Sequence, residues 1–103
     1  MAATINEQIE DRATKALSSD NVPKLYINGF IIFFGQGDIG LVFEQNNRPT
    51  ATVNMSYTLA KTLVEKLGNT IRDFEEKTGN IIMTTDYIAE KMNQESADES
   101  NKQ

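Results

Sequence analysis

The residue types that most often perform catalysis or bind transition metals are missing from this sequence. It contains no histidine and no cysteine, so it lacks the usual general base near neutral pH, a thiolate nucleophile and the common ligands of zinc. The acidic residues Asp73, Glu75 and Glu76 are close neighbours, and the basic residues Arg72 and Lys77 flank them. We interpret this group as a solvated helix face on which Asp73 and Lys77 form an i,i+4 pair. The sequence therefore predicts a protein that is not an enzyme, with no catalytic residue, no metal ligand and no cofactor.

Three glycines match the pattern of a nucleotide-binding loop. Gly35, Gly37 and Gly40 satisfy G-x-G-x-x-G, but a dinucleotide-binding loop leads into a helix whose N-terminal amides meet the pyrophosphate. This loop leads into a short apolar run that is typical of a strand, and the remaining motifs of a kinase are absent. We interpret the glycines as residues of a tight hairpin with a close backbone approach, and Asp38 as a turn residue.

Length and composition are those of one small globular domain. The chain has 103 residues, of which 39% are hydrophobic and 24% are charged, and its net charge is −5. Residues 22–79 are balanced in charge and the two ends hold the acidic surplus, which argues against nucleic acid as a partner. The N-terminus lacks the basic start and apolar run of a signal peptide, and no segment approaches the roughly 20 apolar residues of a membrane span. We expect a cytoplasmic protein with no membrane partner.

The elements expected at the N-terminus are a helix and a linker. Thr4 and Glu7 have the spacing of a capping box, and apolar residues follow at near-helical intervals over residues 4–18. Residues 18–23 have the composition of a linker. We assign residues 1–21 to an N-terminal amphipathic helix with its linker.

Three apolar runs predict an antiparallel meander. They are Lys24–Phe34, Ile39–Glu44 and Thr50–Met55, and turn residues separate them at 35–38 and 45–49. Residues 56–78 then have the apolar stripe of a long helix, with Ser56 as its N-cap and Gly79 as its C-terminal stop. We expect an α+β domain over residues 22–92, in which a three- to four-stranded meander packs against this one long helix.

Less regular elements are expected after Gly79. Residues 81–83 are apolar and predict a short fourth strand, Asp86 is a candidate cap for a last helix, and residues 93–103 are polar enough to predict a disordered acidic tail.

The first strand differs from the others because both of its faces are apolar. One set of alternate residues is Leu25, Ile27, Ile31 and Phe33, and the other is Tyr26, Phe30, Ile32 and Phe34. One long helix covers one face of a three-stranded sheet, so the other face needs the N-terminal helix or a second copy of the chain. We take Tyr26, Phe30, Ile32 and Phe34 as the candidate interaction surface, although the sequence leaves open which set faces a partner.

A resemblance covers residues 24–82. Its features are Asn28, Asp38 and Phe43, then M-S-x-x-x-A-K-x-L from Met55 and an aromatic-Glu-x-x-x-Gly finish at Phe74. This order and spacing resembles a family of small prokaryotic proteins, some of them possible phage proteins, that is known only as a domain of unknown function. The chain departs from the family pattern in having Phe74 where tyrosine is common, and in its N-terminal helix. The layout also looks like that of the SecB export chaperone, which is a likeness of architecture and not of function.

Three functions agree with these observations. The first is a non-catalytic interaction module that forms a homo-oligomer, a dimer or larger, through its sheet, with another protein as a further possible partner. The second is a SecB-like holdase that binds unfolded chains, which would keep an apolar groove open in its oligomer. The third is a small acidic inhibitor of a host protein, of the phage type, which would gather carboxylates on its folded surface.

Overall fold

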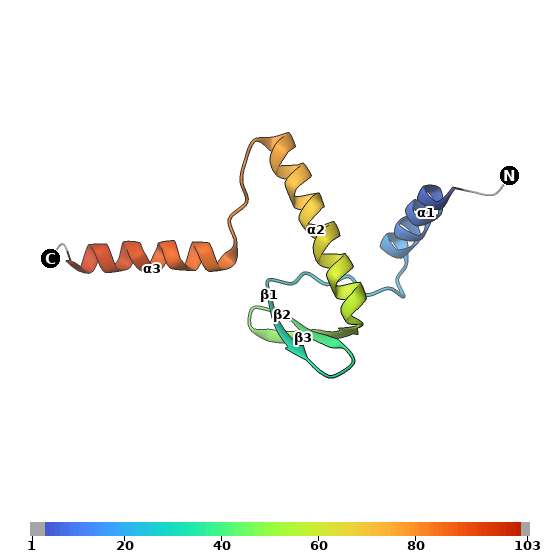
Figure 1. Cartoon of the computed structure of the whole chain (residues 1–103), viewed down its shortest axis with the longest axis horizontal. Helices are drawn as coiled ribbons and strands as arrows, with labels where there is room; N and C mark the ends of the chain where they lie inside the picture. Colours follow the sequence, from blue (N-terminus) through green and yellow to red (C-terminus); the bar gives the residue numbers. More distant parts are fainter. Residues whose placement is uncertain (1–3, 102–103) are drawn as a thin grey trace. The chain divides into compact units, whose positions relative to one another are not determined.

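The computed structural model describes the backbone of residues 4–101 and the side chains of residues 4–95. These residues form three helices and one three-stranded antiparallel sheet, which confirms the α+β class (Figure 1). The elements in chain order are α1 (Ile5–Ser18), β1 (Gly29–Phe34), β2 (Ile39–Gln45), β3 (Arg48–Met55), α2 (Tyr57–Thr78) and α3 (Thr85–Asn101). The chain divides after Tyr57 into two compact units, of which the first holds α1 and the sheet.

Helix α1 begins with the predicted capping box. The Glu7 amide donates to Thr4 Oγ1 at 3.1 Å, and the Thr4 amide donates to Glu7 Oε2 at 3.2 Å. Both bonds satisfy amides that have no partner inside the helix. Lys15 and Asp11 form an i,i+4 ion pair at 3.0 Å, and no residue of the helix is buried.

The sheet is a meander in the order β1-β2-β3, so β2 is the central strand and the other two are edges. Gly35 N–H donates to the Asp38 carbonyl at 2.9 Å and closes the turn between β1 and β2. Asn46 and Asn47 form the two-residue turn between β2 and β3 with φ of 54° and 66°. Both values are positive, as in a type I′ turn, whose twist suits a hairpin and which asparagine tolerates.

Strand β1 is shorter than predicted, because it begins at Gly29 and not at Lys24. Its partner β2 ends at Gln45, where the chain turns toward β3, so no residue of β2 lies opposite residues 24–27. The side chain of Asn28 closes this end: its Oδ1 accepts from the Asn46 amide at 2.8 Å and its Nδ2 donates to Asn46 Oδ1 at 2.9 Å. The other two strands contain the predicted runs, each extended by one or two residues.

Helix α2 has the predicted ends. It begins at Tyr57, directly after Ser56, and Gly79 follows it with φ of 72° and donates its N–H to the Glu75 carbonyl at 2.9 Å. A left-handed residue after the last turn is the usual helix stop, and glycine adopts this conformation without strain. No residue of α2 is buried, so the predicted packing of its apolar stripe on the sheet stays a prediction.

The segment after Gly79 differs from expectation in two respects. Residues 81–83 are not a strand; the Ile82 amide donates to Glu75 Oε2 at 2.7 Å, so a side chain supplies the acceptor that a neighbouring strand would offer. The cap of α3 is Thr84 and not Asp86, because Thr84 Oγ1 accepts from the Tyr87 amide at 3.1 Å. Helix α3 continues to Asn101 through most of the predicted tail, and residues 102–103 lie outside the described residues.

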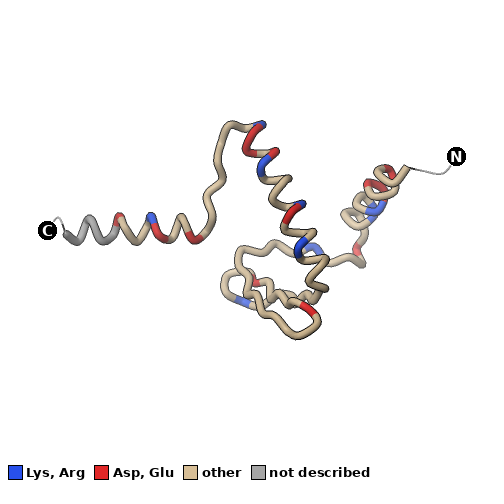
Figure 2. The backbone as a smooth tube through the Cα atoms, in the orientation of Figure 1, with Lys and Arg blue, Asp and Glu red and all other residues tan. Residues whose placement is uncertain are grey.

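Most charged residues lie on the helices, and the strands contain few (Figure 2). In the described part of the chain, Lys15 and Asp11 form the one ion pair, so the predicted pair between Asp73 and Lys77 is not formed. Among the described residues, no helix is both long enough and apolar enough to cross a membrane.

Candidate interaction surface

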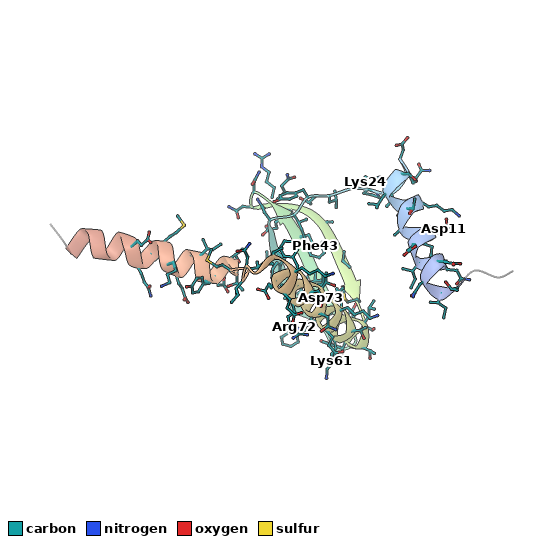
Figure 3. The ribbon with its side chains drawn as sticks, turned by 90° about the horizontal axis from the view of Figure 1, so that it is seen from above. Asp11, Lys24, Phe43, Lys61, Arg72 and Asp73 are labelled. Carbon is teal, nitrogen blue, oxygen red and sulfur yellow. The ribbon has the colours of Figure 1, made fainter. Side chains whose placement is uncertain are left out.

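Cross-strand register sorts the sheet residues into two faces, because residues directly opposite each other share a face. Phe34 lies opposite Ile39, which lies opposite Met55, and the same pairing repeats two residues further along each strand. One face therefore has nine adjoining apolar residues, three from each strand, and the opposed polar pair Gln45 and Arg48 ends it beside the turn between β2 and β3. The nine apolar residues are Phe30, Ile32, Phe34, Ile39, Leu41, Phe43, Ala51, Val53 and Met55. We call this set the apolar face. Figure 3 labels Phe43, a member that lies within the sheet.

The opposite side of the sheet is mixed in polarity. Val42 lies between Ile31 of β1 and Thr52 of β3. Gly40 lies between Phe33 of β1 and Asn54 of β3. Gly40 is the buried residue of this side, and a Cβ built on it would collide with the Phe33 ring. The close backbone approach predicted for these glycines is thus found at Gly40, where an aromatic ring covers the bare backbone.

The candidate residues Phe30, Ile32 and Phe34 lie together on the apolar face. Their exposed fractions are 61%, 54% and 82%, and in the part of the chain that the structure describes no large apolar side chain is buried. Tyr26 is 74% exposed but precedes β1, so the sheet does not place it on either face. The alternating sets are visible in the sequence, but their connection to the neighbouring strand across the turn is not. The two-residue loop Gln36-Gly37 was the available signal, because it sets Gly35 opposite Asp38 and hence Phe34 opposite Ile39.

The two edges of the sheet have opposite character. Strand β1 reads Gly-Phe-Ile-Ile-Phe-Phe, with no charged residue and no proline. Strand β3 begins with Arg48 and Pro49 and has a bulge at Thr50, where the register shifts between Phe43 and Glu44 of its partner. Charge, proline and bulges are the features by which natural sheets protect an edge from pairing. The sheet therefore has one protected edge and one unprotected edge.

Alternate residues of β1 direct their backbone groups away from β2. The bond from Gly35 N–H to the Asp38 carbonyl marks these two residues as a hydrogen-bonded pair, and such pairs alternate along an antiparallel ladder. Phe33 and Ile31 therefore bond to β2, whereas Phe30, Ile32 and Phe34 turn their N–H and C=O groups to the outer edge. In the described chain no strand pairs with that edge.

Polar side chains close the end of the sheet at the turn between β1 and β2. Tyr57 donates its hydroxyl to the Gly35 carbonyl at 2.6 Å, and Asn54 Nδ2 donates to Asp38 Oδ2 at 3.2 Å. Asp38 thus closes the turn with its backbone carbonyl and accepts a hydrogen bond from β3 with its side chain. The G-x-G-x-x-G loop leads into strand β2 as expected, and therefore presents no helix N-terminus to a phosphate group.

Acidic side chains do not gather into a metal-binding cluster in the described residues. No three acidic side chains there come close enough to hold a metal ion. An apolar pocket of ≈ 430 Å³ is lined by Tyr87 of α3 and by residues of the segment that connects α2 to α3, namely Ile81, Ile82, Met83 and Thr84. No acidic or basic side chain lines this pocket, so it has no charged group with which to bind an ion.

Comparisons with protein families, curated proteins and solved structures found no match to this chain.

Proposed function

We propose that the chain is a non-catalytic protein-protein interaction module that self-associates through its sheet, with Phe30, Ile32 and Phe34 in the contact. The observation that supports this most directly is the apolar face, to which each strand contributes three apolar residues. A sheet is stable when such a face packs against another layer. The resemblance to a domain family of unknown function stays a prediction from the sequence and adds no activity to this proposal.

The free energy available from burying this surface is a substantial fraction of the stability of a small domain. Complete burial of one large aliphatic or aromatic side chain contributes roughly 1.5–3 kcal/mol. Phe30, Ile32 and Phe34 are each more than half exposed, so their burial in a contact would contribute about 3–6 kcal/mol, against a typical domain stability of about 5–15 kcal/mol. Their exposure in a single chain therefore favours association.

The mass of the particle in solution tests this proposal. We expect light scattering to give at least twice the 11.5 kDa chain mass at high micromolar concentration. Phe30→Asp places a charge in the proposed contact and is expected to give a smaller particle with an intact circular dichroism spectrum. Thr52→Asp adds the same charge on the mixed side of β3 and is expected to keep the wild-type mass.

Two outcomes would contradict the proposal. A wild-type protein that stays monomeric at high micromolar concentration would exclude self-association. A Phe30→Asp variant that keeps the full assembly mass would show that the contact lies elsewhere.

The exposed apolar side chains also support a second candidate, a SecB-like holdase that binds unfolded chains. This function requires apolar surface that stays accessible after assembly. We expect a holdase to suppress the aggregation of a thermally unfolded test protein at stoichiometric ratios, and Phe43→Asp on the apolar face to weaken that effect. An interaction module whose contact closes the surface would leave the aggregation unchanged.

A further inference from the structure

We propose that two copies join edge to edge through β1, antiparallel and with a twofold axis at Ile32, to form one continuous six-stranded sheet. This inference rests on the proposed self-association and adds to it the element, the direction and the register of the contact.

The unpaired backbone groups of β1 determine the register. Phe30, Ile32 and Phe34 direct their N–H and C=O groups outward, and these groups can pair only with the same three residues of a second antiparallel β1. A twofold axis at Ile32 sets each Ile32 opposite its copy and each Phe30 opposite the copy's Phe34. This register satisfies all the outward groups of the strand. An axis at Ile31 would set Phe34 opposite Asn28, whose amide already donates to the Glu44 carbonyl at 3.0 Å.

The same register keeps the two apolar faces on one side of the joined sheet. Residues opposite each other across the axis differ by an even number, so Phe30, Ile32 and Phe34 of both copies become cross-strand neighbours. Ile31 lies opposite Phe33 on the mixed side. Pairing therefore covers part of the side chains that are most exposed on the strand, among them Phe34 at 82%.

The composition of the two edges favours β1 over β3 as the joining edge. Each copy has a net charge of −5, so a contact that places carboxylates opposite each other would be opposed by repulsion. Strand β1 has no charged residue, and pairing two of them brings no like charges together. An antiparallel pair of β3 edges would have Arg48 and Pro49 at each end of the contact, and proline cannot donate a hydrogen bond to the new ladder.

Disulfide trapping tests the register, and the absence of native cysteine makes each introduced thiol unique. Residues in a hydrogen-bonded pair have Cα atoms about 5.5 Å apart, which is within the range of a disulfide. We expect Ile32→Cys to give a covalent dimer in a glutathione redox buffer. The matched variant Ile31→Cys is expected to stay uncrosslinked, because the two introduced residues would be diagonal neighbours at about 7–8 Å. Val53→Cys on the opposite edge controls for random collision.

Proline substitution tests the backbone contribution separately. Ile32→Pro removes one outward N–H from each copy and leaves the ladder to β2 in place, so we expect self-association to weaken about tenfold or more while the amides of β2 stay protected from exchange. Ile31→Pro removes a donor to β2 and is expected to reduce that protection. The conservative variant Ile32→Val keeps the N–H and is expected to associate nearly as wild type does.

The outcomes distinguish this inference from the proposed function. A covalent dimer from Ile32→Cys alone supports the register. Crosslinking of Ile31→Cys in place of Ile32→Cys would show that the twofold axis lies at Ile31, and would overturn the proposed register. If wild type is an oligomer and neither variant crosslinks above the Val53→Cys control, the β1 contact is wrong and self-association through another part of the sheet stands. A monomeric wild type contradicts both.

Discussion

The contact between Phe33 and Gly40 predicts a measurable energetic coupling. A Cβ at Gly40 would collide with the Phe33 ring, so Gly40→Ala forces the ring to turn away from the strand. Phe33 is 46% exposed, and about half of the roughly 1.5–3 kcal/mol for full burial therefore depends on its present position. The cost of moving the ring is then about 1 kcal/mol.

Alanine also brings a gain that opposes this cost. Glycine within a strand is less favourable than alanine by roughly 0.5–1 kcal/mol, because the unfolded chain loses more freedom when glycine is ordered. Gly40→Ala alone should therefore change the free energy of unfolding by less than about 0.5 kcal/mol. In a Phe33→Ala background the collision is absent, and the same change should stabilise the protein by about 0.5–1 kcal/mol. The expected coupling between the two positions is about 1 kcal/mol.

Urea unfolding of the four proteins in this double-mutant cycle measures the coupling. All four should be compared at one protein concentration, because association adds to the apparent stability. Gly37→Ala is the matched control, since a Cβ there meets nothing within 4 Å, and it should show no coupling to Phe33→Ala. A coupling at Gly40 below about 0.3 kcal/mol would refute the interpretation that the ring depends on the glycine.

Three further predictions follow from the helices. Thr4→Ala removes the capping box of α1 and should cost that helix about 1 kcal/mol, seen as faster amide exchange confined to residues 5–18. Gly68→Ala should stabilise α2 by about 0.5–1 kcal/mol in thermal unfolding, because a Cβ at this helical position meets nothing within 4 Å; destabilisation would reveal a close neighbour. Amides of residues 94–101 should exchange rapidly although their backbone is helical, whereas slow exchange would show that this segment is a stable part of α3.

Features that depend on neighbouring residues in the sequence could be predicted well. The capping box at Thr4 and the glycine stop at Gly79 use residues three or four positions apart, so the sequence contains the whole interaction. The cap of α3 was misplaced by two residues, because Thr84 and Asp86 are both good caps and only the backbone distinguishes them.

Features that depend on a distant partner could not be predicted as well. The start of β1 is determined by where β2 ends and by the amide pair of Asn28 with Asn46, two residues that are 18 positions apart. The apolar composition of residues 24–28 predicts that β1 begins at Lys24, five residues before its actual start at Gly29. The candidate surface shows the same limit. The sequence predicts that Phe30, Ile32 and Phe34 share one face of β1, but only the strand register shows that this face is continuous with apolar residues of β2 and β3.

Each strand of the sheet pairs only with its neighbour in the sequence, and this has a consequence for the rate of folding. Hairpins closed by tight turns form in about 1–10 μs, and domains with such local contacts are among the fastest to fold. Encounter of two chains is bimolecular and depends on concentration. We therefore expect refolding of a self-associating chain to show a fast phase that is independent of concentration, followed by a slower phase whose rate rises with the amount of protein.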